Sequence, residues 1–457
     1  MKNCKVMLWF DVEDFITPEA DDALLALMDM MDSLGIRGSL KIVGEKIRIL
    51  KERGREDILR KIAGHEVCFH TENHSIHPTQ TEYVKDMGFA EGVLEFERRE
   101  RKGFTDVQEI TGQFPTSYGQ PGASWVPQVF PALKKWGVPT YLDSHYLLRL
   151  NEQPFRYGGI LNLTRLWSTM RLEFDEGGIE QAKKDWRDIV DGTPDEGVQL
   201  VSIYYHPCEF ACTDFWDGVN FRRGENPPRE EWKPAPLRGK EEMQRRVDIL
   251  GEFLRWTMET PDAGVEYITA SESCRYEKVP LDPITADDVR ELADSLTGGA
   301  DYRVKGERSL CASELLSLFS REVLGLHRTP EFSYGPEDDV PSEINEPASP
   351  KELARAFAEQ YERVLGFKQL PVRYAVGGNL LNPLDLFENL RRTIADGLDF
   401  DEPMTLTAGQ TKLLPMRHVN TSYDWAKDWI IFPDGLDASK VVKNALLQTW
   451  TLKPAIF

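Results

Sequence analysis

Residues 5–14 read KVMLWFDVED, an apolar run that leads into three carboxylates. The five consecutive apolar residues, 6–10, are typical of a strand buried on both faces. Further strand candidates are residues 39–43, 65–70, 139–142, 159–163, 198–205 and 265–269. Amphipathic helix candidates lie between them, at residues 18–35, 46–63, 84–101 and 240–257. Strands that alternate with helices predict a parallel sheet with helices outside, either open or closed as a barrel.

The composition changes near Pro280, and the chain from residue 286 onward has a mainly helical pattern. The helix candidates there are residues 286–295, 312–323, 350–364, 383–397 and 438–450. A linker rich in proline and acidic residues, 329–350, separates two of these blocks. We therefore expect two domains, residues 1–278 and 279–457. The second could join copies of the chain into a homo-oligomer, cover the barrel mouth as a lid, or bind a ligand.

Length and charge exclude several classes of protein. A chain of 457 residues has room for two or three domains. Its formal charge is 55 − 76 = −21, which argues against non-specific nucleic-acid binding. No apolar run approaches the roughly 20 residues that cross a bilayer. The six cysteines are sparse, and residues 6–10 are too short for a signal peptide, so we expect a reduced, cytoplasmic protein.

Four of the eight histidines lie within residues 65–77. His70 and His74 are four residues apart, so a helical turn would place both imidazoles on one face, as in other histidine pairs that bind a divalent metal. They also follow directly on a predicted strand, where α/β folds place their active sites. The alternative is a polar loop whose histidines cap a helix and bond each other.

Carboxylates at the end of the first strand could complete a metal site. Along an extended segment Asp11 and Glu13 point to one side and Asp14 to the other. One carboxylate could bind the metal while the other acts as a general base. Alternatively, the three acids form a solvated loop or a helix cap. His206 follows another apolar strand and could protonate a leaving nitrogen, or could simply bond to backbone.

Five motifs occur together in an order that resembles one family. FDVED (residues 10–14), HTENH (70–74), YGQPGASW (118–125), YLDS (141–144) and YYHPCEF (204–210) resemble the motifs of polysaccharide deacetylases, the NodB homology or carbohydrate esterase family four. GIRGSLKIVGEKI and EYITASE resemble the second and last strands of that family. The resemblance covers roughly residues 4–275.

The resemblance implies a fold and a reaction. The expected fold is α/β, a distorted (β/α) barrel of about seven strands followed by a mainly α-helical C-terminal region. The expected activity is metal-dependent hydrolysis of a non-peptide amide bond, most simply deacetylation of an N-acetylated carbohydrate. Glu13, His70 and His74 would hold a divalent ion, with zinc as the first choice. Asp11 would be the catalytic base and His206 the general acid.

Further residues are expected to support this set or to contact the carbohydrate. They are Asp14, His77, Gln120, Pro121, Ala123, Trp125 and Asp143. The backbone N–H near Ala123 would help to bind the oxyanion. Gln120 departs from the family, because an arginine that pairs with the base is common at that place.

Gln120 cannot supply the positive charge of that arginine. Either a nearby residue substitutes for it, or the substrate is an atypical amide, or the site is degenerate. Two other functions therefore stay open. One is a hydrolase of non-sugar amides that resembles allantoinases, and the other is an inactive carbohydrate-binding or scaffold protein.

Overall fold

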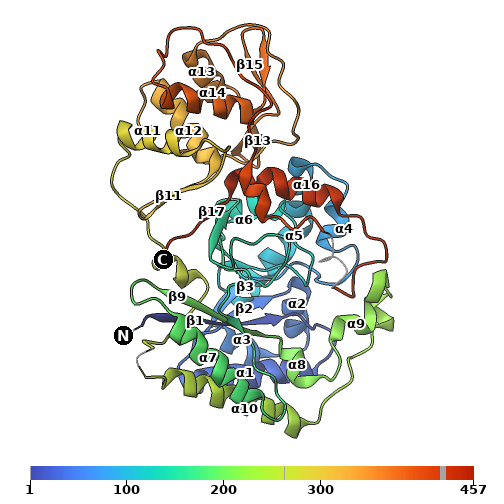
Figure 1. The fold of residues 1–457 in the computed structure, drawn as a ribbon. Helices are drawn as coiled ribbons and strands as arrows, with labels where there is room; N and C mark the ends of the chain where they lie inside the picture. Colours follow the sequence, from blue (N-terminus) through green and yellow to red (C-terminus); the bar gives the residue numbers. More distant parts are fainter. Residues whose placement is uncertain (1, 262, 423–428) are drawn as a thin grey trace.

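A computed structural model describes residues 2–261, 263–422 and 429–457. In these residues an eleven-stranded sheet curls through the N-terminal part of the molecule (Figure 1). In spatial order its strands are β17 (Lys453–Pro454), β6 (Phe155–Tyr157), β7 (Ile160–Asn162), β5 (Thr140–Tyr141), β4 (Ser117–Tyr118), β3 (Glu66–Phe69), β2 (Ser39–Ile42), β1 (Cys4–Val12), β9 (Gln199–Tyr205) and β8 (Thr169–Met170), while β10 (Glu266–Ile268) pairs with the start of β1. The strands from β8 to β7 run parallel, which confirms the predicted distorted α/β barrel.

Strand register brings the motif residues to one edge of the sheet. Asp11 pairs with Lys41, and Phe10 pairs with Tyr205. Ile42 pairs with Phe69, the residue before His70. Because the strands are parallel, the residues that follow them meet at the same edge.

Each of the seven predicted strands has a counterpart in the sheet. The sequence did not reveal β4, β6, β8 and β17, which are only two or three residues long. Segments this short carry too little alternation of apolar and polar residues to stand out from loops.

Helices cover the outside of the sheet. They are α1 (Glu19–Leu34), α2 (Gly44–Glu52), α3 (Glu56–Ile62), α4 (Gln80–Val84), α5 (Phe89–Thr111), α6 (Val129–Trp136), α7 (Gly178–Gly192), α8 (Pro207–Ala211), α9 (Trp216–Asn220) and α10 (Lys240–Met258). Short 3-10 turns are η1 (Arg222–Gly224), η2 (Arg229–Glu231) and η3 (Ser271–Arg275). Helix α1 shows why they form, since Leu24, Leu27 and Met31 recur at helical spacing and are fully buried.

Two helix predictions need correction. The single helix expected over residues 46–63 is α2 and α3, because the chain turns at Gly54 with a φ of 67°. The helix expected over residues 84–101 is observed as α5. It begins only at Phe89, after a break at Gly88, and continues to Thr111.

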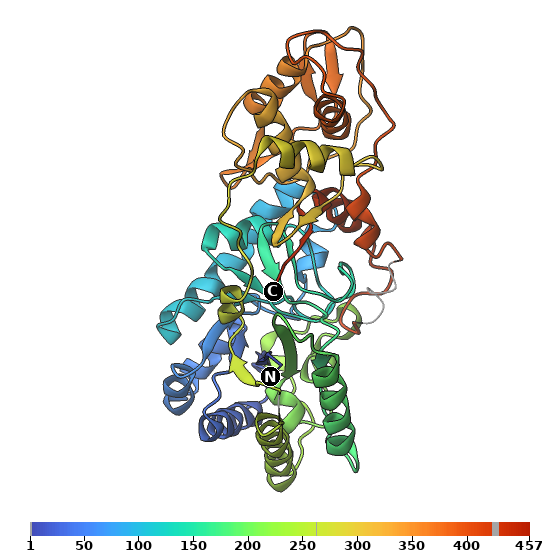
Figure 2. The ribbon, with the colours of Figure 1, turned by 60° about the vertical axis from the view of Figure 1, so that its left-hand side comes forward.

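The chain beyond Pro280 combines helices with hairpins (Figures 1 and 2). Its helices are α11 (Ala286–Ser295), α12 (Ala312–Val323), α13 (Pro350–Glu359) and α14 (Pro383–Ala395). Its hairpins are β11 (Arg303–Lys305) with β12 (Arg308–Leu310), β13 (Glu362–Val364) with β14 (Phe367–Gln369), and β15 (Tyr374–Val376) with β16 (Asn379–Leu381). The region is thus mainly helical as predicted, but the helix expected to reach residue 364 stops at Glu359, where the second hairpin follows. The hairpin turns use Gly306, Gly366 and Gly377, all at positive φ.

The last part of the chain returns to the barrel. After η4 (Leu414–His418) come α16 (Ser439–Leu447) and η5 (Gln448–Thr451), and then β17 pairs with β6. Ile431, Val441 and Leu452 belong to the barrel core, whereas α11–α14 have a core of their own that includes Trp450. In Figures 1 and 2, α16 lies between the barrel and the α11–α14 module, and the molecule is elongated. A boundary between two domains at 278/279 stays a prediction.

None of the helices in the described ranges combines the length and apolarity needed to cross a membrane.

Candidate metal centre and active site

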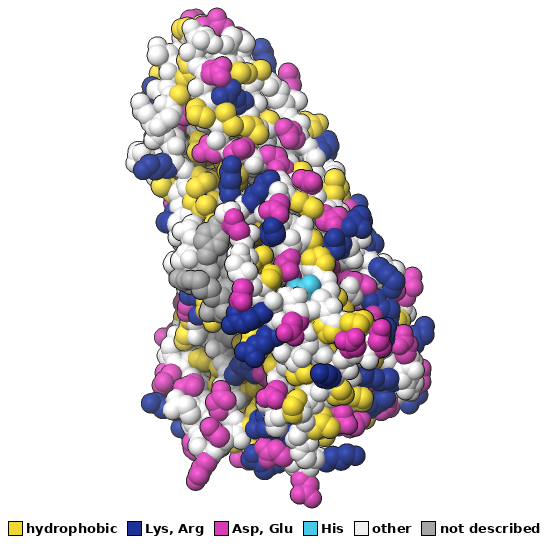
Figure 3. Space-filling model, turned by 90° about the vertical axis from the view of Figure 1, so that its right-hand side faces the viewer, with side chains coloured by type: hydrophobic (Ala, Val, Ile, Leu, Met, Phe, Trp, Pro, Cys, Tyr) yellow, Lys and Arg dark blue, Asp and Glu magenta, His cyan; other side chains and the backbone are white. Residues whose placement is uncertain are grey.

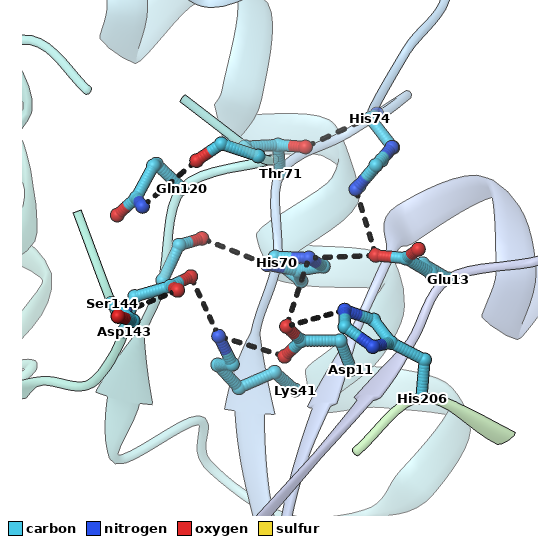
Figure 4. A network of polar contacts seen from close by, with 12 residues as sticks. Asp11, Glu13, Lys41, His70, Thr71, His74, Gln120, Asp143, Ser144 and His206 are labelled. Atoms are coloured by element: carbon cyan, nitrogen blue, oxygen red, sulfur yellow. Dashed lines mark hydrogen bonds and ion pairs between the residues drawn. The ribbon is translucent and has the colours of Figure 1, made fainter. Parts of the chain in front are cut away.

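Three side chains meet around one point at the carboxyl edge of the sheet (Figure 4). Oε2 of Glu13 lies 2.8 Å from Nε2 of His74 and 3.2 Å from Nε2 of His70. All three side chains are buried. One carboxylate oxygen and two imidazole nitrogens therefore converge within 4.8 Å of one another.

The chain between the two histidines is a turn of irregular backbone instead of the expected helical turn. Thr71 and His74 both have left-handed backbone, with φ of 68° and 50°. Oγ1 of Thr71 accepts a hydrogen bond of 3.1 Å from the His74 N–H. The two rings come within 5.0 Å of each other between centroids, so the pair forms without the predicted helix.

Neighbouring groups orient each of the three candidate ligands. Nδ1 of His70 donates to the Gly119 carbonyl at 2.9 Å, which leaves the Nε2 lone pair free. Nδ1 of His74 lies 2.6 Å from the Ser75 hydroxyl, which in turn donates to Asp217 at 2.8 Å. Because the hydroxyl uses its proton on Asp217, it accepts from His74, and the Nε2 of His74 is free as well.

A hydrogen bond to its second carboxylate oxygen fixes the orientation of Glu13. The indole N–H of the fully buried Trp216 donates to Oε1 at 2.9 Å, so Oε2 is left for the imidazoles. Trp216 and Asp217 had no site role in the sequence analysis. A tryptophan and an aspartate on a short helix give no pattern that distinguishes them from packing residues.

The donor set fits a divalent cation. Nε2 of His74 is buried and has no hydrogen-bond partner, although the Glu13 carboxylate is close. Two imidazoles and one carboxylate are a ligand set typical of catalytic zinc, with a position left open for water or substrate. Burial raises the pKa of Glu13, but the neighbouring histidines outweigh it and hold the pKa well below the usual range.

Lys41, on a different element from Gln120, places a positive charge beside Asp11. Its Nζ lies 2.7 Å from Oδ1 of Asp11 and 2.8 Å from Oδ2 of Asp143, and its side chain is fully buried on β2 (Figure 4). Burial raises the pKa of Asp11, but Lys41 and the histidines lower it below the ordinary aspartate value. A nearby residue thus supplies the charge that Gln120 lacks.

Gln120 itself forms hydrogen bonds with the loop after β4 and with β5. Its amide donates to the Gly122 carbonyl at 3.0 Å and accepts from the Tyr141 hydroxyl at 2.8 Å. Lys41 could have been noticed in the sequence, because a lysine in the middle of an apolar strand needs a buried partner.

His206 lies on the other side of Asp11. Its Nε2 is 3.4 Å from Oδ2 of Asp11, and its Nδ1 is 3.4 Å from Glu209, which also forms an ion pair with Arg171. Burial lowers the pKa of His206, but the carboxylates of Glu209, Glu13 and Asp11 raise it well above the usual value. These carboxylates favour the protonated imidazole, which can donate a proton.

Two other predicted residues brace the loops around this centre. The Asp14 carboxylate accepts hydrogen bonds from the N–H groups of Ile16 and Thr17, at 2.9 and 2.8 Å, and does not face the histidines. His77 lies outside the ligands, with Nδ1 2.7 Å from Glu82 and Nε2 donating to the Phe221 carbonyl at 3.0 Å.

The remaining predicted residues surround the loop after β4. Pro121 precedes Gly122 and accepts from the Ser124 N–H at 2.9 Å, and Ala123 lines the cavity. Within the described ranges the Ala123 N–H makes no hydrogen bond. Trp125 is fully buried and stacks on His145, so it offers no face to the cavity.

A cavity of about 840 Å³ opens above Asp11, Glu13 and His74. Part of its wall comes from the far end of the chain, namely Trp429 and Ile430. The indole of Trp429 lies over Gly122, where a Cβ would come within 2.4 Å of the ring, and its centroid is 6.0 Å from that of His74. A cover over the barrel mouth was one of the roles left open for the C-terminal region, but the sequence did not indicate which of its residues would line the cavity.

Comparison with known proteins gives similarity to solved structures only, since no family model and no curated protein matches. The structure resembles that of PuuE allantoinase, with a TM-score of 0.39 and 12% identity over 60% of this chain and 90% of that one. It also resembles a Mycobacterium smegmatis protein assigned as a polysaccharide deacetylase (TM-score 0.36, 16% identity, 60% and 89% covered). A third similar structure is a CE4 family pseudoenzyme from Bacillus anthracis (TM-score 0.29, 11% identity, 58% and 64% covered).

Proposed function

We propose that the chain is a metal-dependent hydrolase of a non-peptide amide bond that removes the acetyl group from an N-acetylated carbohydrate. The observation that carries the proposal is the convergence of Glu13, His70 and His74, each oriented by a further partner, beside the pair Asp11 and His206. A divalent cation held there, with zinc as first choice, would supply Lewis acidity toward an amide carbonyl and toward water.

The residues of the chain have separable tasks in this proposal. Asp11, held by Lys41, takes the proton of the attacking water. His206 carries a proton and delivers it to the departing nitrogen. Ala123 lines the same cavity, and its N–H would donate to the carbonyl oxygen as negative charge develops there. The products are acetate and a free amine.

The cysteines and the exposed apolar residues support two further parts of the proposal, the cellular compartment and the assembly of the chain. The six cysteines, all in described segments, are free thiols, as a cytoplasmic protein of carbohydrate metabolism would have. We further propose that residues 279–457 join copies of the chain. Val304 of this region exposes 44% of its surface and Leu281 exposes 92%.

Acetate release tests the proposal. The zinc-loaded protein should release acetate from N-acetylglucosamine derivatives, and Asp11→Asn should lower the rate at least 100-fold while it keeps the metal. Cyclic ureides in the same screen test the allantoinase-like alternative. Saturable glycan binding without acetate at any metal loading would instead establish the inactive binding protein.

A further inference from the structure

One wall of the active-site cavity has hydrogen-bond donors without acceptors. It begins at His145, which lines the cavity and is only 2% exposed. Neither ring nitrogen of His145 has a hydrogen-bond partner in the described parts of the chain. Leaving a buried polar group unpaired costs about 1–3 kcal/mol, so this imidazole points to a partner that the chain does not supply.

Two arginines outside the cavity lining pack against the next residue of this wall, Tyr146. The guanidinium carbon of Arg165 lies 3.7 Å from the ring centroid of Tyr146, another residue of the cavity wall, and that of Arg149 lies 4.9 Å from it. The Nε atom of each arginine is buried and finds no hydrogen-bond partner in residues 2–261, 263–422 and 429–457. Among the described residues Arg165 has no ion pair, and Arg149 has only a loose one of 3.7 Å to Glu152.

Arg149 and Arg165 bring two positive charges to this part of a chain that carries −21 as a whole, although acidic side chains such as Asp143, Asp214 and Asp217 line the cavity elsewhere. Burial, together with the charges of Arg149 and Arg165, lowers the pKa of His145 to about 3, so the ring is neutral at pH 7. The neighbouring carboxylate of Asp143 forms an ion pair with Lys41 (Figure 4). Acidic and basic side chains are interspersed over much of the surface in Figure 3, with a group of lysines and arginines beside the residues drawn in grey.

We propose that His145, Tyr146, Arg149 and Arg165 bind an oxyanion on the substrate, a phosphate ester or a carboxylate carried at a distance from the reacting amide. The inference rests on the proposed function, because the same cavity contains the amide site. Guanidinium groups bind phosphate and carboxylate through paired hydrogen bonds, and the neutral imidazole can donate one more. A neutral sugar would offer no charge to Arg165, which has no ion pair among the described residues, and Arg149 would keep only its loose pair with Glu152.

Binding of inorganic phosphate and of acetate tests the inference without reference to activity. The zinc-loaded, full-length protein is titrated by calorimetry at low ionic strength. Arg165→Gln and, as a second variant with ordinary backbone, Arg149→Gln should each weaken binding at least tenfold. Phosphate that binds at the metal is unaffected by these changes, so the loss reports on this wall. Stronger binding of acetate than of phosphate would assign the group as a carboxylate, and the reverse as a phosphate.

Arg223→Gln is the matched control. Arg223 has the same left-handed backbone as Arg165, with φ of 53° against 49°, but it is exposed and pairs with Asp434. Binding should be unchanged in this variant. Equal binding by wild type and both test variants, or no binding by the wild type, would overturn the inference.

Deacetylation of N-acetylglucosamine and of its 1-phosphate separates the two proposals. If Arg165→Gln loses anion binding but neither sugar is deacetylated, the anion site stands and the proposed activity fails. If both sugars react equally well and Arg165→Gln changes neither rate, the activity stands and the anion site fails.

Discussion

At the scale of single residues, a lysine on a strand supplies the charge that Gln120 lacks. Register places Lys41 directly beside Asp11, so the charge reaches the carboxylate from the neighbouring strand instead of from the position of Gln120. The two carboxylates on Lys41 raise its pKa against the effect of burial, which keeps it charged. Such a site is sensitive to the loss of either partner.

Lys41→Met should lower kcat at least 100-fold, because Asp11 loses the group that orients it. Metal affinity should stay within a few-fold, since Lys41 does not touch Glu13 or the histidines. Steady-state kinetics and a metal titration on the folded fraction measure both. Lys5→Met is the control: Lys5 is a buried lysine at the other end of β1, paired with Glu266. A loss of metal in Lys41→Met, or unchanged kcat, would contradict this role.

Asp217→Asn should weaken metal binding about 10–100-fold. The change removes the carboxylate that holds the Ser75 hydroxyl toward His74. Competition with a chelator measures the affinity. Asp214→Asn, a change of the same kind in the cavity wall, should leave the affinity unaltered. Equal affinities in the two variants would show that the Ser75–Asp217 contact has no part in metal binding.

At the scale of elements, α5 braces the loop that carries the histidines. Glu100 on α5 accepts hydrogen bonds from the Glu72 N–H at 2.6 Å and from the Tyr83 hydroxyl at 3.0 Å. Burial raises the pKa of Glu100 to about 7, against 4.5 for the unperturbed group. Folding therefore favours the protonated carboxyl.

This shift predicts a pH dependence of stability. The contribution of Glu100 is fully present below pH 4.5 and is lost as pH rises through 7, a change of up to about 3 kcal/mol. Urea unfolding across this pH range should show a fall in the free energy of unfolding with rising pH in the wild type but not in Glu100→Gln. Glu91→Gln, an exposed change on the same helix, should retain it. If the free energy of unfolding changes with pH in the same way in wild type and in Glu100→Gln, Glu100 is not the cause of the pH dependence.

At the scale of the whole molecule, the C-terminal segment joins the two cores. Trp450 is 1% exposed and packs in the core of α11–α14, while Leu452 two residues later is in the barrel core. The Tyr157 hydroxyl donates to the Ala445 carbonyl at 3.0 Å, and the Tyr334 hydroxyl to the Gly158 carbonyl at 3.0 Å. These contacts couple the parts, so we expect one cooperative unfolding transition.

Calorimetry of wild type and Trp450→Ala tests this coupling. The free energy of unfolding of the variant should be about 3–5 kcal/mol lower than that of the wild type. Its single transition should shift to lower temperature without splitting in two. Trp167→Ala, at an indole that is 38% exposed, should cost much less. Two separate transitions, with only one of them shifted by Trp450→Ala, would contradict the coupling.

Much of this arrangement is predictable from the sequence, and the exceptions have physical reasons. Apolar runs such as β1 and β9, and capped amphipathic helices such as α11 and α12, carry strong local patterns. The motif residues meet because parallel strands end at one edge. Lys41, Trp216 and Trp429 could not be placed in the same way, since their roles depend on register and on contacts between distant segments.

The most direct test is the metal content of the purified protein after dialysis against a buffer with trace zinc. Wild type should hold about one zinc per chain, and His70→Ala should hold almost none. His65→Ala, at a buried histidine of the same segment that accepts from the Gly38 N–H, should still hold one. A wild type without zinc, or a full complement in His70→Ala, would contradict the metal centre on which the account depends.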